Sequence, residues 1–141
     1  ILVDSPQLVQ TQGMLVDALD SIRVRFPSSL IWTPGIGGPD NCALLSWLGV
    51  DLFDLSRSRS AASLNILLTS LGPREVEYST DEMADMKAQC EEWKKSISAT
   101  RAAIRDGSLR ELAEKQRVQR LSQFDNQATQ MHERVHQLLL R

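Results

Sequence analysis

A glycine-rich loop set between short apolar runs is the sequence feature that most constrains the fold. The loop Gly35–Gly38 follows the apolar run Leu30–Trp32 and leads into a helical pattern at Pro39–Leu48. Gly49 ends that pattern, and the apolar run Val50–Leu55 begins directly after it. Short apolar runs that alternate with helices are typical of a parallel sheet covered by helices. We therefore predict α/β architecture for this part of the chain.

The N-terminal residues predict another unit of the same kind. Ile1–Val3 is a short β-branched run, and Ser5 directly before a proline is typical of a helix N-cap. The helix is expected to end before Pro27, and its apolar stripe consists of Leu8, Leu15, Leu19 and Ile22. Together these features predict a strand followed by a helix.

Two more extended segments are expected after the third apolar run. They lie at 65–70 and 75–78, and the dipeptide Gly72-Pro73 between them is typical of a turn. The strands recognisable in the sequence are too few to close a barrel, which takes roughly 250 residues.

From Ser79 onward the apolar period is helical. Ser79 with Glu82 forms a capping box, Gly107 suits a helix C-terminus, and Ser108 restarts a helix. A last amphipathic stripe is formed by Phe124, Ala128, Met131, Val135 and Leu138. We therefore predict a β/α portion at 1–78 and a helical segment at 79–141 that packs on it.

Charge and composition exclude several classes of protein. A chain of 141 residues with a net charge of −2 is not a strongly basic nucleic-acid binder, and residues 1–79 hold no lysine. No apolar run approaches the roughly 20 residues that span a bilayer, so no membrane partner is expected. Cys42 and Cys90 have no metal-type spacing, which favours a reducing, cytoplasmic location. Because the chain begins at Ile1 rather than methionine, we expect a fragment.

Three motifs in order resemble the tRNA-guanine transglycosylase superfamily, most of all its archaeal, archaeosine synthase branch. They are "GVDLFD" at Gly49–Asp54, "LLT" followed by a glycine at Leu67–Gly72, and "AIRDGSLRELAEKQ" at Ala103–Gln116. Residues 1–39, with "DSPQLV" and "PGIGGP", are also similar to that branch. The resemblance implies a (β/α)8 TIM barrel that binds tRNA and acts on a 7-deazaguanine-type base, as in archaeosine biosynthesis.

The same resemblance suggests site residues. Asp54 matches the position of the nucleophile that carries the base-exchange intermediate, and a carboxylate is a competent nucleophile at a sugar carbon. The alternative is that Asp54 caps the next turn. Gly35, Gly37, Gly38 and Trp32 are expected near the base or ribose, although a glycine loop is also an ordinary feature of a tight turn.

Two departures from the family shape the expectation of function. The residues after the "LLT" segment, 75–87, contain no cysteine or histidine, so the family's zinc site is missing. The family's "PC…KPY" segment is missing too. We therefore expect no metal and no cofactor, and a partial barrel equivalent to the C-terminal half of the catalytic-type domain. Another chain, identical or different, would complete it.

Basic residues offer candidate contacts to tRNA. The predicted contacts are Arg57, Arg59, Arg101 and Arg105. Acidic residues are interspersed among the later arginines, so a solvated helix face is the alternative. A non-catalytic subunit of the same lineage, which binds tRNA or a partner without chemistry, is the second functional hypothesis.

Two other patterns have simpler explanations. The run "HERVH" at His132–His136 has the spacing of a zinc peptidase, but a third ligand is not evident, and this hypothesis is a minor one. Trp47 and Trp93 each lie within an apolar helical pattern, which predicts core positions rather than platforms for base stacking.

Overall fold

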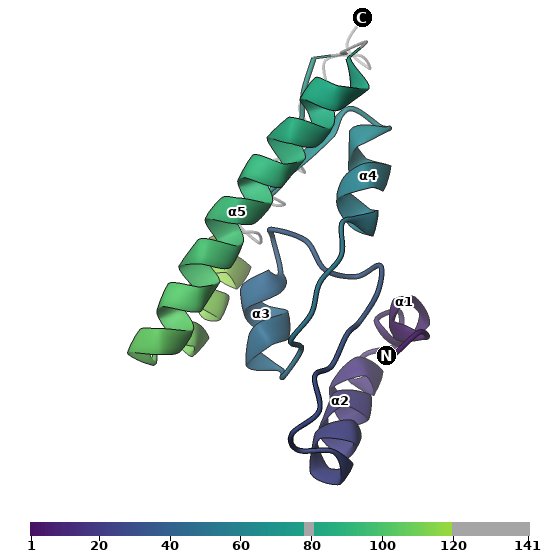
Figure 1. Ribbon diagram of the computed structural model, residues 1–141, viewed down its shortest axis with the longest axis vertical. Helices are drawn as coiled ribbons and strands as arrows, with labels where there is room; N and C mark the ends of the chain where they lie inside the picture. The colour runs from purple at the N-terminus through teal and green to yellow at the C-terminus, as the bar shows by residue number, and fades with distance from the viewer. Residues whose placement is uncertain (78–80, 120–141) are drawn as a thin grey trace, which may run out of the picture.

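The computed structural model describes residues 1–77 and 81–119 of the chain and shows a mostly helical α/β fold (Figure 1). A further helix occupies 109–119 within the described residues. The elements are α1 (Ser5–Leu8), α2 (Met14–Arg25), α3 (Cys42–Trp47), α4 (Ser56–Ala62), β1 (Ile66–Thr69), β2 (Gly72–Glu75) and α5 (Glu82–Asp106).

The described residues form no barrel, and their one sheet is a two-stranded antiparallel hairpin. The three apolar runs expected as parallel strands do lie side by side, but only a few contacts among the described residues join them. Leu2 N–H donates to the Trp32 carbonyl over 2.9 Å, and Trp32 forms an isolated parallel bridge with Leu52. The runs are too short to extend this ladder, because Pro34 lacks an N–H and Gly35 turns the chain at φ +80°.

The hairpin differs from the prediction in the position of its turn. Ser70 and Leu71 form the turn, so that Gly72 and Pro73 belong to β2. The Thr69 hydroxyl explains this, because it accepts a hydrogen bond from Leu71 N–H and donates one to the Gly72 carbonyl. The strand predicted at 65–70 is confirmed as β1, whereas the second strand begins earlier than predicted.

Both edges of this hairpin are protected against further strand pairing. On the β1 edge, the amide of Gln89 donates to the Ile66 carbonyl over 2.6 Å and accepts from Leu68 N–H over 3.2 Å. Because Leu68 N–H points to Gln89, its β2 partner Pro73 has its nitrogen on the outer edge, where it has no hydrogen to donate. These two features hinder the pairing of this sheet with a strand of another chain.

The main apolar core lies between α2, α3 and the parallel runs. It contains Leu15, Leu19, Ile31, Ile36, Leu45 and Val50. The predicted stripe at Leu15 and Leu19 is thus confirmed, but Gly13, at φ +85°, separates α2 from the short α1. Ser5 is not the N-cap, because Asp4 occupies that position and the buried Ser5 hydroxyl donates to the Pro34 carbonyl.

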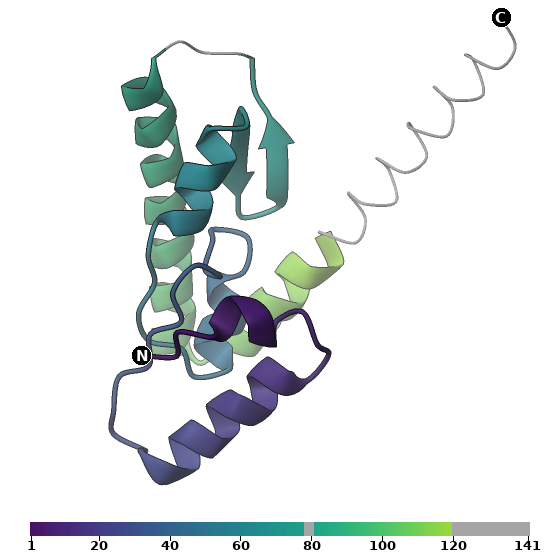
Figure 2. The ribbon, with the colours of Figure 1, turned by 90° about the vertical axis from the view of Figure 1, so that its right-hand side faces the viewer.

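Helix α5 is the long element against which the hairpin, α3 and α4 pack. Figure 2 shows the hairpin and α4 beside its first half. It contacts β1, α3 and α4, and its buried face repeats every three or four residues at Gln89, Trp93, Ser96, Thr100 and Ala103. The prediction of a core position is confirmed for Trp93 and wrong for Trp47, which is 47% exposed.

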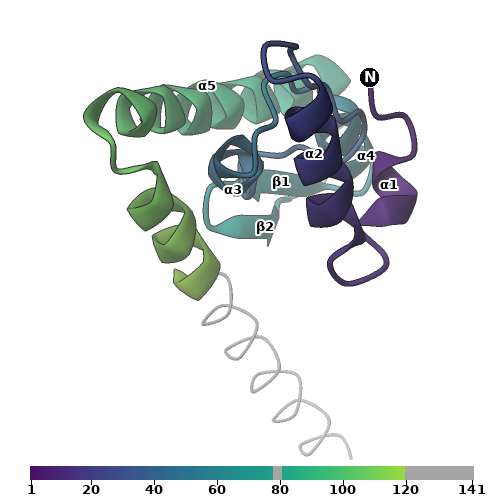
Figure 3. The ribbon, with the colours of Figure 1, turned by 90° about the horizontal axis from the view of Figure 1, so that it is seen from below.

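The predicted break after α5 is confirmed. Gly107 has a φ of +81°, and the Asp106 carboxylate accepts from the backbone N–H of Ser108 over 3.0 Å. Figure 3 shows the helix at 109–119 leaving the end of α5 in a new direction. Among the described helices, none is long and apolar enough to cross a membrane.

Candidate functional site

The Asp54 carboxylate lies between the parallel bridge at Leu52 and the start of α4, and it accepts hydrogen bonds from Trp32, Gly35 and Ser56, the last through both its backbone and its side chain. Oδ2 accepts from the Trp32 indole Nε1 over 3.2 Å and from Gly35 N over 3.0 Å. Oδ1 accepts from the Ser56 backbone N over 2.8 Å. The structure therefore brings together Asp54, Trp32 and Gly35, which the sequence had placed in one candidate site.

The pKa of Asp54 lies below the usual value for aspartate. Burial acts against ionisation, but the hydrogen bonds from Ser56, Gly35 and Trp32 together outweigh burial and stabilise the charged form. Asp54 is therefore an oriented anion at neutral pH. The same Ser56 contact is an Asx turn that leads the chain into α4, as the alternative interpretation of Asp54 predicted.

Protein side chains fill the space beside Gly37 and Gly38. A Cβ added at Gly37 would lie 2.7 Å from Phe53 Cδ1, and one at Gly38 would overlap the Asp40 carboxylate and the Arg57 guanidinium. Both glycines are buried. Their lack of side chains thus serves internal packing, and contact of this loop with a base or ribose stays a prediction.

Arg57 holds the glycine loop to the first turn of α4. Its two terminal nitrogens contact the two carboxylate oxygens of Asp40 over 2.9 and 3.0 Å. The Asp40 side chain is 1% exposed and that of Arg57 is 31% exposed. Arg57, predicted as a tRNA contact, is therefore committed to a largely buried ion pair. The sequence analysis missed Asp40, although an acid next to a glycine loop and before a helix was a visible signal.

The other predicted basic contacts lie on exposed surfaces. Arg59 is on α4, and Arg101 and Arg105 are one turn apart on α5. Helix α4 meets α5 where Trp93 Nε1 donates to the Ser58 hydroxyl over 2.8 Å. Arg101 is eight residues beyond Trp93, which is roughly 12 Å along a helix. Arg101 and Arg105 therefore lie two turns or more along α5 from the point where α4 contacts it.

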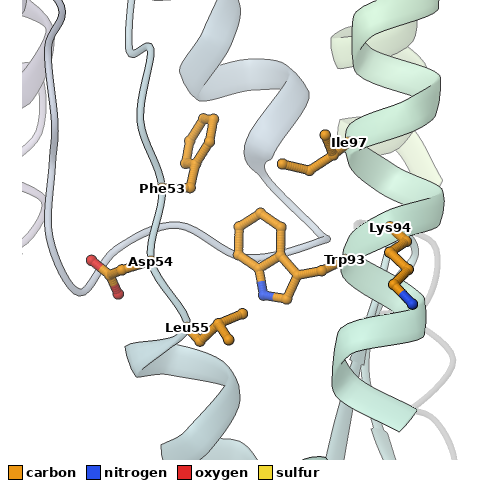
Figure 4. Close-up of a pocket in the computed structure, with 6 residues that line it drawn as sticks. All are labelled: Phe53, Asp54, Leu55, Trp93, Lys94 and Ile97. Carbon is orange, nitrogen blue, oxygen red and sulfur yellow. The ribbon is translucent and has the colours of Figure 1, made fainter. Parts of the chain in front are cut away.

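An apolar pocket of about 270 Å³ lies between the segment that carries Asp54 and α5. It is lined by Phe53, Asp54, Leu55, Trp93, Lys94 and Ile97 (Figure 4). The rings of Phe53 and Trp93 are 5.9 Å apart between centroids. Figure 4 shows the Asp54 carboxylate pointing away from Trp93 and Ile97, so the charge faces the glycine loop rather than the pocket.

No metal centre is present among residues 1–77 and 81–119, where no group of three potential ligands from His, Cys, Asp and Glu was found. Both cysteines are free thiols. Burial raises the pKa of the Cys42 thiol, which keeps it protonated. The "HERVH" run at 132–136 lies outside the described residues.

The fold and the site define a mostly helical α/β protein with an oriented, ionised aspartate at the end of a rudimentary parallel ladder. Comparison with known proteins adds one distant, partial similarity. The chain is 28% identical over 102 residues to archaeosine synthase subunit alpha of Methanosarcina acetivorans. The match covers 72% of this chain and 14% of that protein. No protein-family model and no solved structure matches the chain.

Proposed function

We propose that the chain is part of a tRNA-modifying transferase of the archaeosine synthase lineage, which acts on a 7-deazaguanine-type base in tRNA. The observation that carries this proposal is the similarity to archaeosine synthase subunit alpha over 72% of the chain. The order of "GVDLFD", "LLT…G" and "AIRDGSLRELAEKQ" supports the same lineage. As part of this proposal, we divide the chain into a β/α portion at 1–78 and a helical segment at 79–141.

Within this function, contact with the base or ribose is a better role for Asp54 than covalent attack. The hydrogen bonds from Trp32, Gly35 and Ser56 fix the carboxylate and keep it ionised. They also stabilise the anion, which lowers its reactivity as a nucleophile while leaving its power to accept a hydrogen bond. We infer that Asp54 recognises the substrate.

A non-catalytic subunit that binds tRNA or a protein partner is the alternative. The observation in its favour is that the motif residues have structural tasks. Asp54 forms an Asx turn into α4, Arg57 is paired with Asp40, and the space beside Gly38 is filled from within. Such a chain would bind tRNA or a protein partner as part of the same lineage and would catalyse no reaction.

A partner chain is part of the proposal because the parallel runs are covered on one side only. Their inward residues join the core under α2 and α3, whereas Val3, Leu30 and Leu52 are 69%, 69% and 45% exposed. Parallel sheets are normally covered on both faces. A homo- or hetero-oligomer at micromolar concentration in sedimentation is the expected result, and a stable monomer would contradict it.

Binding of tRNA tests the central proposal. Fluorescence anisotropy would compare the affinity of the 141-residue chain for a tRNA transcript with the affinities of Asp54→Ala and Asp20→Ala. Asp20 is an exposed acid on α2 and serves as the control. Weaker binding by Asp54→Ala alone supports the proposal. Equal binding by all three proteins would contradict a role of Asp54 in recognition.

A further inference from the structure

Basic residues of α5 share one face of the helix, where they follow one another at intervals of seven, seven and four residues. They are Lys87, Lys94, Arg101 and Arg105. All of them are exposed. Because residues seven and four apart lie one above the other on a helix, their side chains form a basic stripe roughly 27 Å long. The buried face of α5, which carries Trp93, lies on the opposite side.

Glu91 is the acid at the edge of the basic stripe. It pairs with Lys94 over 2.8 Å, and the two side chains are 50% and 71% exposed. An ion pair as exposed as this contributes little to stability, so the charge of Lys94 remains available to another anion. The basic stripe is therefore a positively charged surface on a chain whose net charge is −2.

The apolar pocket beside Asp54 borders the basic stripe, because Lys94 belongs to both. Figure 4 shows the amino group of Lys94 pointing away from Phe53 and Ile97, so its stem lines the pocket while its charge lies at the rim. The Asp54 carboxylate also points away from the pocket and is bonded to Gly35 of the glycine loop. The pocket is thus apolar inside and cationic at its edge.

We propose that the basic stripe binds the phosphate backbone of an unpaired RNA strand and that the pocket holds one of its bases. Proteins bind single strands by combining cations along the backbone with aromatic contacts to the bases. Here Phe53 and Trp93 supply the aromatic rings. A paired strand would use the stripe alone, because its bases are stacked inside the double helix. The inference rests on the proposed function, whose tRNA-binding surface it identifies.

Lys94 and Lys95 form a matched pair for a test of the basic stripe. Their side chains are 71% and 70% exposed, and each pairs with the glutamate three residues earlier. They lie on different faces, because adjacent residues are about 100° apart around a helix. Lys94→Gln should bind single-stranded oligouridylate about two- to tenfold more weakly in fluorescence anisotropy, with a smaller dependence of affinity on salt. Lys95→Gln should match the wild type, and equal losses in both variants would overturn the stripe.

Leu55→Ser tests the pocket. Leu55 is 37% exposed, lines the pocket and occupies the N-cap of α4, where serine is favourable, so the variant should fold. Leu64→Ser, at a 68% exposed position beyond the end of α4, is the control. Leu55→Ser should bind oligouridylate about two- to tenfold more weakly and a self-complementary RNA duplex as the wild type does. An equal loss for both RNAs, or for neither, would overturn the base pocket.

The same variants with a tRNA transcript separate this inference from the proposed role of Asp54. If Lys94→Gln and Leu55→Ser bind tRNA as the wild type does and Asp54→Ala does not, the stripe and pocket are wrong and the proposed function stands. If Asp54→Ala alone binds normally, the role of Asp54 is wrong and the stripe and pocket stand. A wild-type chain that binds no oligouridylate would overturn the inference. Polyglutamate that displaces oligouridylate at equal charge concentration would do so too, because it would point to an acidic protein as the partner.

Discussion

Arg57 and Asp40 form a two-pronged ion pair that connects the first turn of α4 to the glycine loop, with the Asp40 side chain almost wholly buried. Arg57 Nη1 also contacts the Ile36 carbonyl over 3.4 Å. Planar guanidinium groups suit such bidentate contacts. The pair fixes the loop that supplies Gly35 N–H to Asp54, and so it supports the candidate site from behind.

Removal of Arg57 should therefore destabilise the protein rather than only weaken a tRNA contact. We expect Arg57→Leu to lower the free energy of unfolding by about 3 kcal/mol, because a buried carboxylate loses its cation. Arg59→Leu, on an exposed position of the same helix, should change it by less than about 0.5 kcal/mol. Urea denaturation followed by circular dichroism measures both values, and equal small changes would show that the ion pair contributes little.

Gln89 should be needed to protect the edge of β1. In Gln89→Met the side chain keeps its length but no longer pairs with Ile66 and Leu68, so two strand groups lose their partners. We expect a loss of about 2 kcal/mol in unfolding free energy and a greater tendency to aggregate. Lys87→Met, exposed on the same helix, is the control for added apolar surface. Aggregation by both variants to the same extent would rule out edge protection as the cause.

Gly38 should tolerate no side chain. We expect Gly38→Ala to cost about 1–3 kcal/mol in unfolding free energy, because its Cβ would overlap the Asp40–Arg57 pair. Gly13→Ala is an informative comparison, since no atom lies within 4 Å of a Cβ there and the cost comes from its φ of +85° alone. That cost should be about 1 kcal/mol. Thermal unfolding of both variants checks the order, and a Gly38→Ala protein as stable as wild type would contradict the packing.

Whether a feature of the fold or of the candidate site could be predicted depends on how far apart in the sequence the residues that determine it lie. The stripe of α2, the long α5 and its end at Gly107 follow from local periodicity and capping, and all three were predicted. The apolar runs at 1–3 and 30–32 were mistaken for full strands because a three-residue run cannot show whether a ladder continues. Asp54 was recognisable at the end of its run.

The partners of Asp54 were harder to foresee. Trp32 and Gly35 lie 22 and 19 residues earlier in the chain, and no local pattern connects them to the carboxylate. The same is true of Arg57 and Asp40, which are 17 residues apart. Trp32 was suggested as a site residue because it lies beside the glycine loop, and Gly35 because a glycine allows close approach of the backbone. Their hydrogen bonds to Asp54 emerge only from the folded chain.

Substitution of Asp54 by asparagine should be destabilising, because a single amide oxygen cannot replace both carboxylate oxygens. If the amide oxygen accepts from Trp32 and Gly35, the amide NH2 group faces the Ser56 N–H, and two donors meet. In the reverse orientation the NH2 group faces the N–H groups of Trp32 and Gly35. Asp54→Ala should cost on the order of 1 kcal/mol. Melting curves therefore have to accompany any assay of Asp54 variants.

The pH dependence of stability isolates the charge of Asp54. Burial raises its pKa, but the hydrogen bonds lower it further, so the folded pKa lies below the ordinary value of 3.8. Ionised Asp54 thus stabilises the fold above pH 3.8, and this contribution is lost as the pH falls through the folded pKa. The stability difference between wild type and Asp54→Asn should shrink in that acid range and stay constant from pH 5 to 7, as measured by urea denaturation. If base exchange or tRNA binding by Asp54→Asn equals that of the wild type at pH 7, Asp54 serves the fold alone and the similarity reflects ancestry.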